Sequence, residues 1–233
     1  MEQPVNIFDS KYAALIEAPA YSLFTVHRYL RVKYTTMLYW VRGRGSVRPL
    51  ITLPQTEPPT LSFANLLECH VLNALLTKYS LQLPRVRNAL ETVEKMYPSK
   101  HPLLTEDFKS DGIDLFVERA TKPEEIVNLS KGGQLAIREI VRVYLERIVW
   151  RDGAPKFYPF VAKKQADEPK IISIAPTVAF GRSVIDGTAI STAVIASRFS
   201  ARESIYRLAE EYGRTGEEIE EAIRWEAGEP APA

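Results

Sequence analysis

The stretch that decides the fold of the first part of the chain is YSLFTVHRYLRVKYTTMLYWVRG, residues 21–43. Its apolar residues recur at helical spacing in two sets, first Leu23, Val26 and Leu30, then Met37, Trp40 and Val41. Ser22 is a suitable N-cap for the first helix, and Gly43 and Gly45 end the second. Two short helices joined by a break at residues 31–33 form the outline of a helix-turn-helix.

Charge is distributed unevenly along the chain, although 30 basic and 29 acidic residues give a net charge of only +1. Residues 18–56 contain no Asp or Glu but hold six basic residues, which are Arg28, Arg31, Lys33, Arg42, Arg44 and Arg48. From residue 201 to the end, four arginines face nine glutamates, a local balance of −5. Because duplex DNA attracts a basic surface whatever its sequence, the first region favours nucleic-acid binding.

The second helix offers residues for two kinds of DNA contact. If its apolar residues face the core, small polar and aromatic side chains can approach base edges, and these are Tyr34, Thr35, Thr36 and Tyr39. Basic side chains suited to phosphates flank them, namely Lys33, Arg42, Arg44 and Arg48. The Pro-rich passage RPLITLPQTEPPT, residues 48–60, is interpreted as a strand-and-loop wing. The alternative is a plain helical hairpin whose basic stretch is only solvated.

The remaining patterns predict a mainly α fold with short β elements, which is the α+β class. A wide apolar stripe over residues 62–79 indicates a helix that is either central or paired with another subunit. Asp111-Gly112 predicts a tight hairpin, and an amphipathic helix follows at 137–149. The helical clusters at the two ends do not align, and there is no tandem repeat. We predict a winged helix-turn-helix domain at 1–98, a mixed α/β segment at 99–170, a small helical domain at 171–227 and a flexible tail at 228–233.

Motifs for catalysis are missing from the sequence. The spacing of the three histidines is not that of a metal site; they are His27, His70 and His101. The lone Cys69 allows neither an intramolecular disulfide nor a Cys-rich zinc site. The aspartates that could serve a nuclease are spaced like surface and turn residues; they are Asp107, Asp111 and Asp114. No nucleophile elbow, Walker loop or dinucleotide-binding fingerprint is present, so we expect no enzyme activity, no catalytic residue, no metal and no cofactor.

The sequence predicts neither export nor membrane insertion. The first residues, MEQPVNIFDS, lack a basic region followed by an apolar core. No window approaches the roughly 20 apolar residues of a membrane span. A single cysteine suits a reducing compartment, so we expect a cytoplasmic protein without membrane contact.

Residues 21–40, continued by LSFANLLECHVLNALLTKYSLQLPRVRNAL at 61–90, resemble the winged helix-turn-helix of the MerR-like group. In that group a wing and two more helices follow the recognition helix, and the resemblance implies operator DNA as a partner. Arg31 stands where the family's turn favours Gly, Lys33 where it favours a Ser-like cap, and His27 where it favours Ala. A non-Gly residue in such a turn is costly if its φ is positive.

The C-terminal part carries a second resemblance. FGRSVIDGTAIST at 180–192 and SIYRLAEEYGRTGEEIEEAI at 204–223 are similar to a small bacterial domain with a Gly-Arg-Pro-x-Ile-x-Gly-Thr-x-Ile motif, associated with VapB-type antitoxins. Six residues fall in register with the motif, which are Gly181, Arg182, Ile185, Gly187, Thr188 and Ile190. Ser183 replaces the usual Pro. In that family the domain accompanies PIN-like ribonuclease toxins, so the resemblance implies such a toxin as a second partner.

The two resemblances together imply the antitoxin of a type II toxin-antitoxin pair. Such a protein neutralises a PIN-like ribonuclease by direct contact and binds operator DNA to autoregulate its operon, and a homodimer would match a two-fold operator. We expect the partner to bind at five residues, which are Arg182, Asp186, Thr188, Glu210 and Glu211. The alternative is a stand-alone MerR-like transcription regulator that senses a small ligand. A third reading, an RNA-processing enzyme, requires metal-dependent cleavage by the purified chain.

Overall fold

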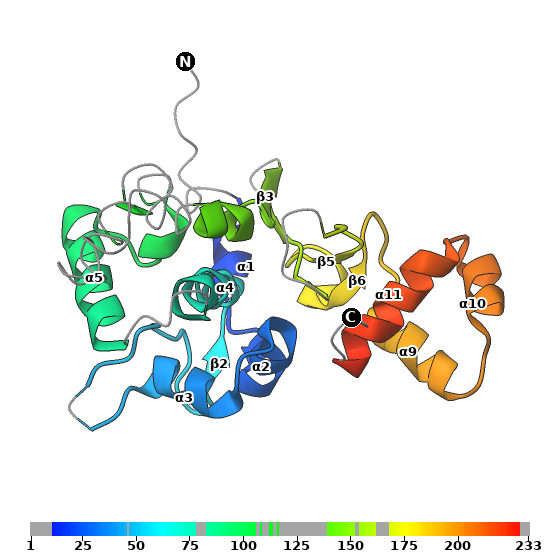
Figure 1. Ribbon diagram of the computed structural model, residues 1–233, viewed down its shortest axis with the longest axis horizontal. Helices are drawn as coiled ribbons and strands as arrows, with labels where there is room; N and C mark the ends of the chain where they lie inside the picture. Colours follow the sequence, from blue (N-terminus) through cyan, green and yellow to red (C-terminus); the bar gives the residue numbers. More distant parts are fainter. Residues whose placement is uncertain are drawn as a thin grey trace, which may run out of the picture. The chain divides into compact units, whose positions relative to one another are not determined.

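The computed structural model describes residues 11–45, 47–77, 83–105, 108, 112–113, 116, 139–151, 154–161 and 168–228. It divides into two compact units, Met1–Glu146 and Arg147–Ala233 (Figure 1). Helices and short strands occur together, which confirms the predicted α+β class. The domain boundaries predicted at residues 98/99 and 170/171 stay predictions, and residues 229–233 of the predicted tail lie outside the described residues.

Helices dominate the first unit. Its elements in chain order are α1 (Ala13–Glu17), β1 (Tyr21–Ser22), α2 (Leu23–Leu30), α3 (Tyr34–Arg42), β2 (Thr60–Leu61), α4 (Phe63–Thr77), α5 (Leu83–Met96) and the 3-10 turn η1 (Pro102–Leu104). Residues 139–145 are also helical. The strands β1 and β2 pair antiparallel, with Tyr21 opposite Leu61, so the chain entering α2 is tied to the chain entering α4.

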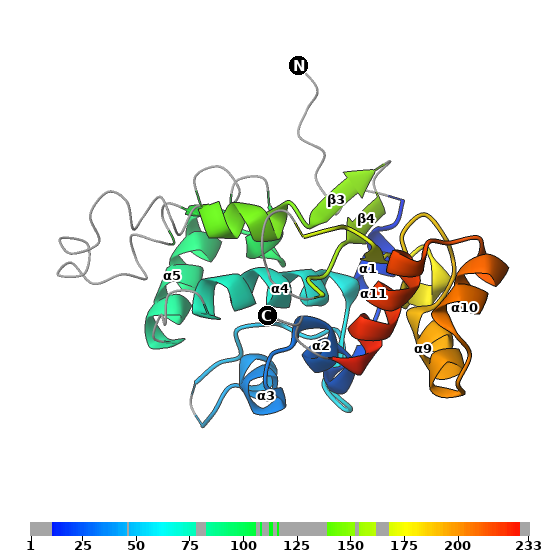
Figure 2. The ribbon, with the colours of Figure 1, turned by 45° about the vertical axis from the view of Figure 1, so that its right-hand side comes forward.

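The helix α4 forms the core of the first unit. Figure 2 shows it crossing the middle of this unit, and α1, α2, α5 and η1 all contact it. Every residue from 63 to 75 is buried, including polar ones such as His70, whose Nε2 donates to the carbonyl of Tyr144 at 3.0 Å. The wide apolar stripe predicted here therefore belongs to a central helix. It is used within the chain and gives no support to a contact between subunits.

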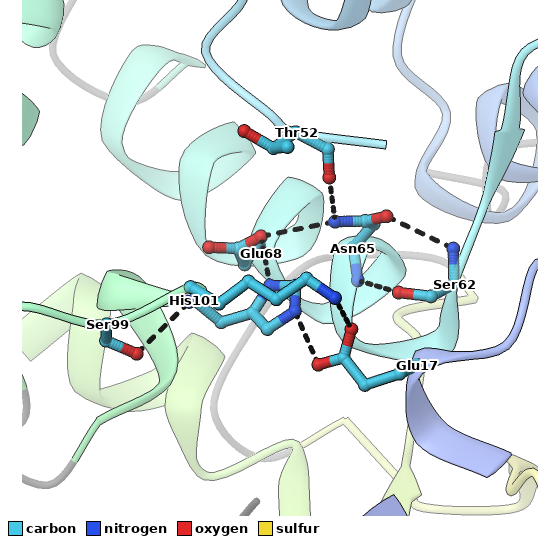
Figure 3. A network of polar contacts seen from close by, with 8 residues as sticks. Glu17, Thr52, Ser62, Asn65, Glu68, Ser99 and His101 are labelled. Carbon is cyan, nitrogen blue, oxygen red and sulfur yellow. Dashed lines mark hydrogen bonds and ion pairs between the residues drawn. The ribbon is translucent and has the colours of Figure 1, made fainter. Parts of the chain in front are cut away.

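A buried polar network joins α1, α4 and the start of η1 (Figure 3). His101 is 1% exposed, and its two ring nitrogens bond the carboxylates of Glu68 at 2.7 Å and Glu17 at 2.8 Å. Asn65 donates to Glu68 at 3.5 Å and to the carbonyl of Thr52 at 3.0 Å. Burial alone lowers the pKa of His101, but the hydrogen bonds and charges of Glu68 and Glu17 outweigh it, so this pKa is raised.

Two sequence predictions for the region after η1 need correction. The predicted hairpin at Asp111-Gly112 is wrong, because Gly112 and Phe116 are helical; Asp111 itself lies outside the described residues. Phe108 and Phe116 are buried against each other, with ring centroids 6.5 Å apart, and this packing overrides the turn signal. The helix predicted to run to residue 149 also ends early, because Ile148 begins a strand.

An antiparallel sheet and three helices make up the described part of the second unit. The strands are β3 (Ile148–Arg151), β4 (Ala154–Phe157), β5 (Ile172–Ile174) and β6 (Ser183–Ile185), and they lie in sequence order in the sheet. A 3-10 turn η3 (Ala179–Gly181) precedes β6, and three helices follow, α9 (Thr192–Ser200), α10 (Ile205–Tyr212) and α11 (Gly216–Ala227). The helix α11 packs on α9, β5 and β6, so the predicted helical C-terminal part includes two strands.

A buried cation holds the start of the second unit. Arg147 is 1% exposed, and its guanidinium donates to the carbonyls of Tyr158 at 2.8 Å, Glu168 at 2.6 Å and Pro159 at 3.1 Å. It also lies over the ring of Phe160, 4.7 Å from the centroid. These bonds draw together the two segments that follow β4 and precede β5. A buried charge left without such partners is strongly destabilising, so the arrangement of the sheet depends on this residue.

The raised pKa of His101 makes stability depend on pH. Because its folded pKa lies above the unfolded value of 6.5, its contribution is complete below that value and is lost as pH rises through the folded pKa. We expect the wild type to exceed His101→Gln in urea resistance by more at about pH 6 than at about pH 9. Urea unfolding of both proteins at both pH values measures this. A difference that is constant, or larger at the higher pH, would contradict the network.

Candidate functional site

The pair α2 and α3 has the predicted turn at residues 31–33. The hydroxyl of Ser22 accepts a hydrogen bond from the amide of Thr25 at 3.1 Å, so the predicted N-cap of α2 is confirmed. The helix ends at Arg31, whose φ of 53° and ψ of 38° are left-handed. The ring of His27 donates through Nδ1 to the carbonyl of Val32 at 2.6 Å, which closes the turn. This role is structural and was not foreseen from the sequence.

The residues predicted to contact DNA lie on the outward side of α3, at its N-cap and in the segment that follows it. Its inward side is the predicted one, since Met37, Trp40 and Val41 are buried. Six of the predicted residues are exposed, which are Lys33, Tyr34, Thr35, Arg42, Arg44 and Arg48. The other two, Thr36 and Tyr39, are partly exposed. All eight are therefore accessible, and the spacing of three residues makes Tyr39 and Arg42 neighbours on the surface of α3.

A fixed turn after α3 carries the arginines. Arg44 and Val47 exchange backbone hydrogen bonds of 3.2 and 3.0 Å, and the carbonyl of Trp40 accepts the amides of Leu50 at 2.7 Å and Ile51 at 3.1 Å. A second bridge joins Gln55 to Thr60. The passage interpreted as a wing, residues 48–60, thus contains one bridged turn, and the other bridged turn directly precedes it.

One acidic residue from the segment that follows α3 lies beside this basic surface. Glu57 lies just beyond residues 18–56, the acid-free window, and its carboxylate is 3.7 Å from the guanidinium of Arg42. Their side chains are 83% and 51% exposed, so the ion pair is screened by water and contributes little. Residue order alone could not show that Glu57 lies next to Arg42.

The pair α10 and α11 repeats the geometry of α2 and α3. Each first helix has eight residues and a serine N-cap, Ser22 or Ser204, whose hydroxyl accepts an amide hydrogen bond. Each first helix ends at a left-handed residue, Arg31 in one pair and Gly213 in the other, where φ is 61° and ψ is 39°. The next helix begins three residues later in both pairs. The two ends of the chain, which do not align as sequences, therefore share the same pattern of helix caps and the same turn length.

The two second helices differ in charge. The helix α3 contains Arg42 and no acidic residue. The helix α11 contains five glutamates and one arginine, and the glutamates are Glu217, Glu218, Glu220, Glu221 and Glu226. Because phosphates are repelled by carboxylates, only the first pair is a candidate for nucleic-acid binding.

Three of the residues predicted to bind a partner make bonds within the second unit. Asp186 bonds Lys156 at 2.8 Å, and although burial raises its pKa, hydrogen bonds from Lys156 and Ser173 outweigh this and lower it. The hydroxyl of Thr188 donates to the carbonyl of Ile185 at 2.7 Å, which holds the turn after β6. Glu211 bonds Arg198 at 2.6 Å. The other two, Arg182 and Glu210, are exposed. Partner contact at all five stays a prediction.

Ser183, which stands where the antitoxin-associated motif has Pro, is part of a hydrogen-bond network. It is 3% exposed, and its hydroxyl lies 2.7 Å from that of Thr192, which in turn bonds the carboxylate of Glu226. The network connects β6, α9 and α11. The serine therefore supplies a bond that Pro could not make.

Other polar clusters in the described residues have structural roles. The three histidines all bond neighbours in the first unit, through Val32, Tyr144 or the carboxylates beside His101. Across the described ranges, no group of three or more His, Cys, Asp or Glu side chains could hold a metal ion. Asp107, Asp111 and Asp114 lie outside these ranges. None of the helices in the described part of the chain has the length and apolar character needed to cross a membrane.

Both units are similar in sequence to parts of known proteins. Residues 172–225 match the family described as "Protein of unknown function (DUF433)", a segment that runs from β5 into α11. A curated relative from Mycobacterium tuberculosis (strain ATCC 25618 / H37Rv), named "Putative antitoxin VapB45", is 25% identical over 236 residues. The alignment covers 92% of this chain and 97% of the relative. The likeness to a protein named as an antitoxin thus extends over nearly the whole of both chains.

A solved structure shares the fold. The crystal structure of Rv2018 from Mycobacterium tuberculosis is 24% identical to this chain, with a TM-score of 0.67. The match covers 89% of this chain and 99% of that chain.

The turn that follows α3 gives a test of its geometry. Gly43 and Gly45 both have positive φ, 69° and 59°, but a Cβ on Gly43 would lie 2.0 Å from the carbonyl oxygen of Val47, whereas Gly45 has open space. We expect Gly45→Ala to lower the free energy of unfolding by about 1 kcal/mol and Gly43→Ala to lower it by clearly more. Urea unfolding measures both variants. Equal costs would show that the bridged turn is not formed.

Proposed function

We propose that this chain is the antitoxin of a type II toxin-antitoxin pair. Its first unit would bind promoter DNA and its second unit would bind and inhibit a PIN-like ribonuclease, while the chain itself performs no chemistry. The observation that carries the proposal is the likeness, over most of both chains, to a protein named as an antitoxin. The opposite charges of α3 and α11 support a division of the two tasks between the two units.

The DNA side of the proposal rests on the surface of α3 and its following turn. Small polar side chains, Thr35 and Thr36, lie near the start of the helix, and Arg42, Arg44 and Arg48 lie at its end and beyond. The N-terminal residues of a recognition helix contact base edges, while flanking basic residues bind phosphates. We further propose a homodimer, because a two-fold operator requires two copies of this surface. Since α4 is buried, the contact between copies lies elsewhere.

The toxin side rests on charge. Glu210, Glu217 and Glu220 are exposed on α10 and α11, and within the described residues none of the three takes part in an ion pair. A ribonuclease needs a positive groove for RNA, and an acidic helical surface is attracted to such a groove. Complementary fields of this kind mainly raise the association rate.

Variants of α3 and its turn separate the two kinds of DNA contact. Arg42→Ala with Arg44→Ala should weaken binding to every duplex and reduce the slope of log K against log salt by about 0.9 for each lost phosphate contact. Thr35→Ala with Thr36→Ala should change the preference among sequences and leave that slope intact. Fluorescence anisotropy with DNA from upstream of the reading frame, and with unrelated DNA, measures both. Arg202→Ala with Arg207→Ala, exposed in the second unit, is the matched control and should bind like the parent.

The assignment to DNA is wrong if both pairs of variants in the first unit bind every duplex as the parent does. It is also wrong if the control in the second unit weakens binding as much as the variants of Arg42 and Arg44.

Co-expression tests the toxin side. We expect the protein encoded by the adjacent reading frame to co-purify with this chain and to lose ribonuclease activity in the complex. Glu217→Lys with Glu220→Lys should slow association, because it reverses the charge of the exposed face of α11. Glu91→Lys with Glu94→Lys, two exposed positions on α5, is the control of equal charge. Absence of a complex, or a complex whose ribonuclease stays active, would refute the proposed function.

A further inference from the structure

Several of the exposed apolar side chains in the first unit belong to the basic stretch of residues 18–56. The large ones in its described part are Leu15, Phe24, Tyr34, Val47 and Met96. Three of these five, Phe24, Tyr34 and Val47, lie within the acid-free window, where they are 60%, 43% and 37% exposed. Contacts to phosphates need only charge and hydrogen-bond donors. Exposed aromatic residues among arginines and lysines therefore indicate a ligand that also has apolar groups.

Two of these side chains belong to one aromatic strip. The ring of His27 lies between them, with its centroid 5.8 Å from Phe24 and 6.1 Å from Tyr34, and it meets the tyrosine ring at 89°. The bond from His27 to the carbonyl of Val32 fixes this ring in the turn. The strip of Phe24, His27 and Tyr34 is therefore preorganised across the outer side of both helices.

Basic residues at both ends of the helix that carries Tyr34 favour duplex DNA as the occupant of the strip. Lys33 and Arg42 are exposed at the two ends of α3, which a rise of 1.5 Å per residue places about 13 Å apart. In a helix that lies in the major groove, basic residues at both ends can bind the phosphates that line the groove. Tyr34, the first residue of α3, then lies where a recognition helix contacts base edges.

We propose that Phe24 and Tyr34 contact the 5-methyl group of thymine and thereby set a preference for thymine in the bound site. The methyl group is the apolar feature of the major-groove edge, and aromatic side chains are suited to contact it. The inference rests on the proposed binding of DNA and adds the chemical group that is recognised. It also gives Phe24, which has no basic or polar group to offer, a part in the binding surface.

Methyl deletion tests the contact without knowledge of the operator. Binding is measured by fluorescence anisotropy, at several salt concentrations, to four short hairpin-closed duplexes of alternating sequence. These are d(AT), d(AU), d(GC) and d(GC) with 5-methylcytosine, so each pair differs only in the methyl group. We expect d(AT) to bind about fourfold more tightly than d(AU) for each methyl group buried, and the methylated d(GC) to gain similarly.

Variants identify the side chains responsible. Phe24→Ala with Tyr34→Ser should bring the ratio between d(AT) and d(AU) close to one while leaving the salt dependence unchanged. Leu15→Ser with Met96→Ser removes exposed apolar groups elsewhere in the same unit and should leave the ratio as in the parent. All four positions are exposed, and thermal melting of each variant confirms that it is folded.

The outcomes are distinguishable. Failure to bind any duplex overturns the proposed DNA function and this inference with it. Duplex binding with equal affinity for d(AT) and d(AU) overturns the methyl contact alone. Tighter binding to single-stranded oligo(dT) than to either duplex also overturns it, because the strip would then stack on unpaired bases.

Discussion

The direction in which α3 leaves α2 depends on one residue in a disfavoured conformation. Arg31 is left-handed, which costs a residue with a Cβ roughly 1–2 kcal/mol. The conformation is maintained because the carbonyls before and after it are both bonded, Leu30 by Asn73 at 3.4 Å and Val32 by His27 at 2.6 Å. Asn73 belongs to α4, which is buried along most of its length. The core of the first unit thus sets the orientation of the surface that carries the basic residues.

The corresponding turn in the second unit adopts its left-handed conformation at a lower cost in free energy. Gly213 adopts the left-handed conformation without a Cβ, and Thr215 and Glu218 complete a capping box, whereas Lys33 makes no side-chain cap. The turn of the first pair therefore depends more on bonds from the rest of its unit, whereas residues of the second turn itself hold that turn. The helix pairs α2/α3 and α10/α11 have similar turns but opposite charges. This is consistent with a chain that binds a polyanion at one end and a basic protein at the other.

Local signals predicted much of the fold. Helical spacing identified Met37, Trp40 and Val41 as the inward face of α3, and cap residues such as Ser22 identified where helices begin. These signals succeed because they depend on neighbours within one turn of helix. The hairpin predicted at Asp111-Gly112 failed because packing of Phe108 on Phe116 prevails over turn preference.

Such local signals could not predict contacts between residues that are far apart in the sequence. No pattern shows that Glu57 lies beside Arg42, that Asp186 is bonded to Lys156, or that His101 lies between two carboxylates. The sequences of the two helical pairs differ at most positions, so they do not show the similarity. For example, Arg31 corresponds to Gly213 and Lys33 to Thr215. Backbone conformation revealed it.

Amide chemical-shift mapping tests most directly the central claim that α2 and α3, rather than α10 and α11, form the DNA surface. The isotope-labelled chain is titrated with a short duplex from upstream of its own reading frame. If α2 and α3 form the DNA surface, the shift changes will be centred on residues 22–48, with residues 204–227 unchanged. Changes centred on residues 204–227, or equal changes in both pairs, would contradict it.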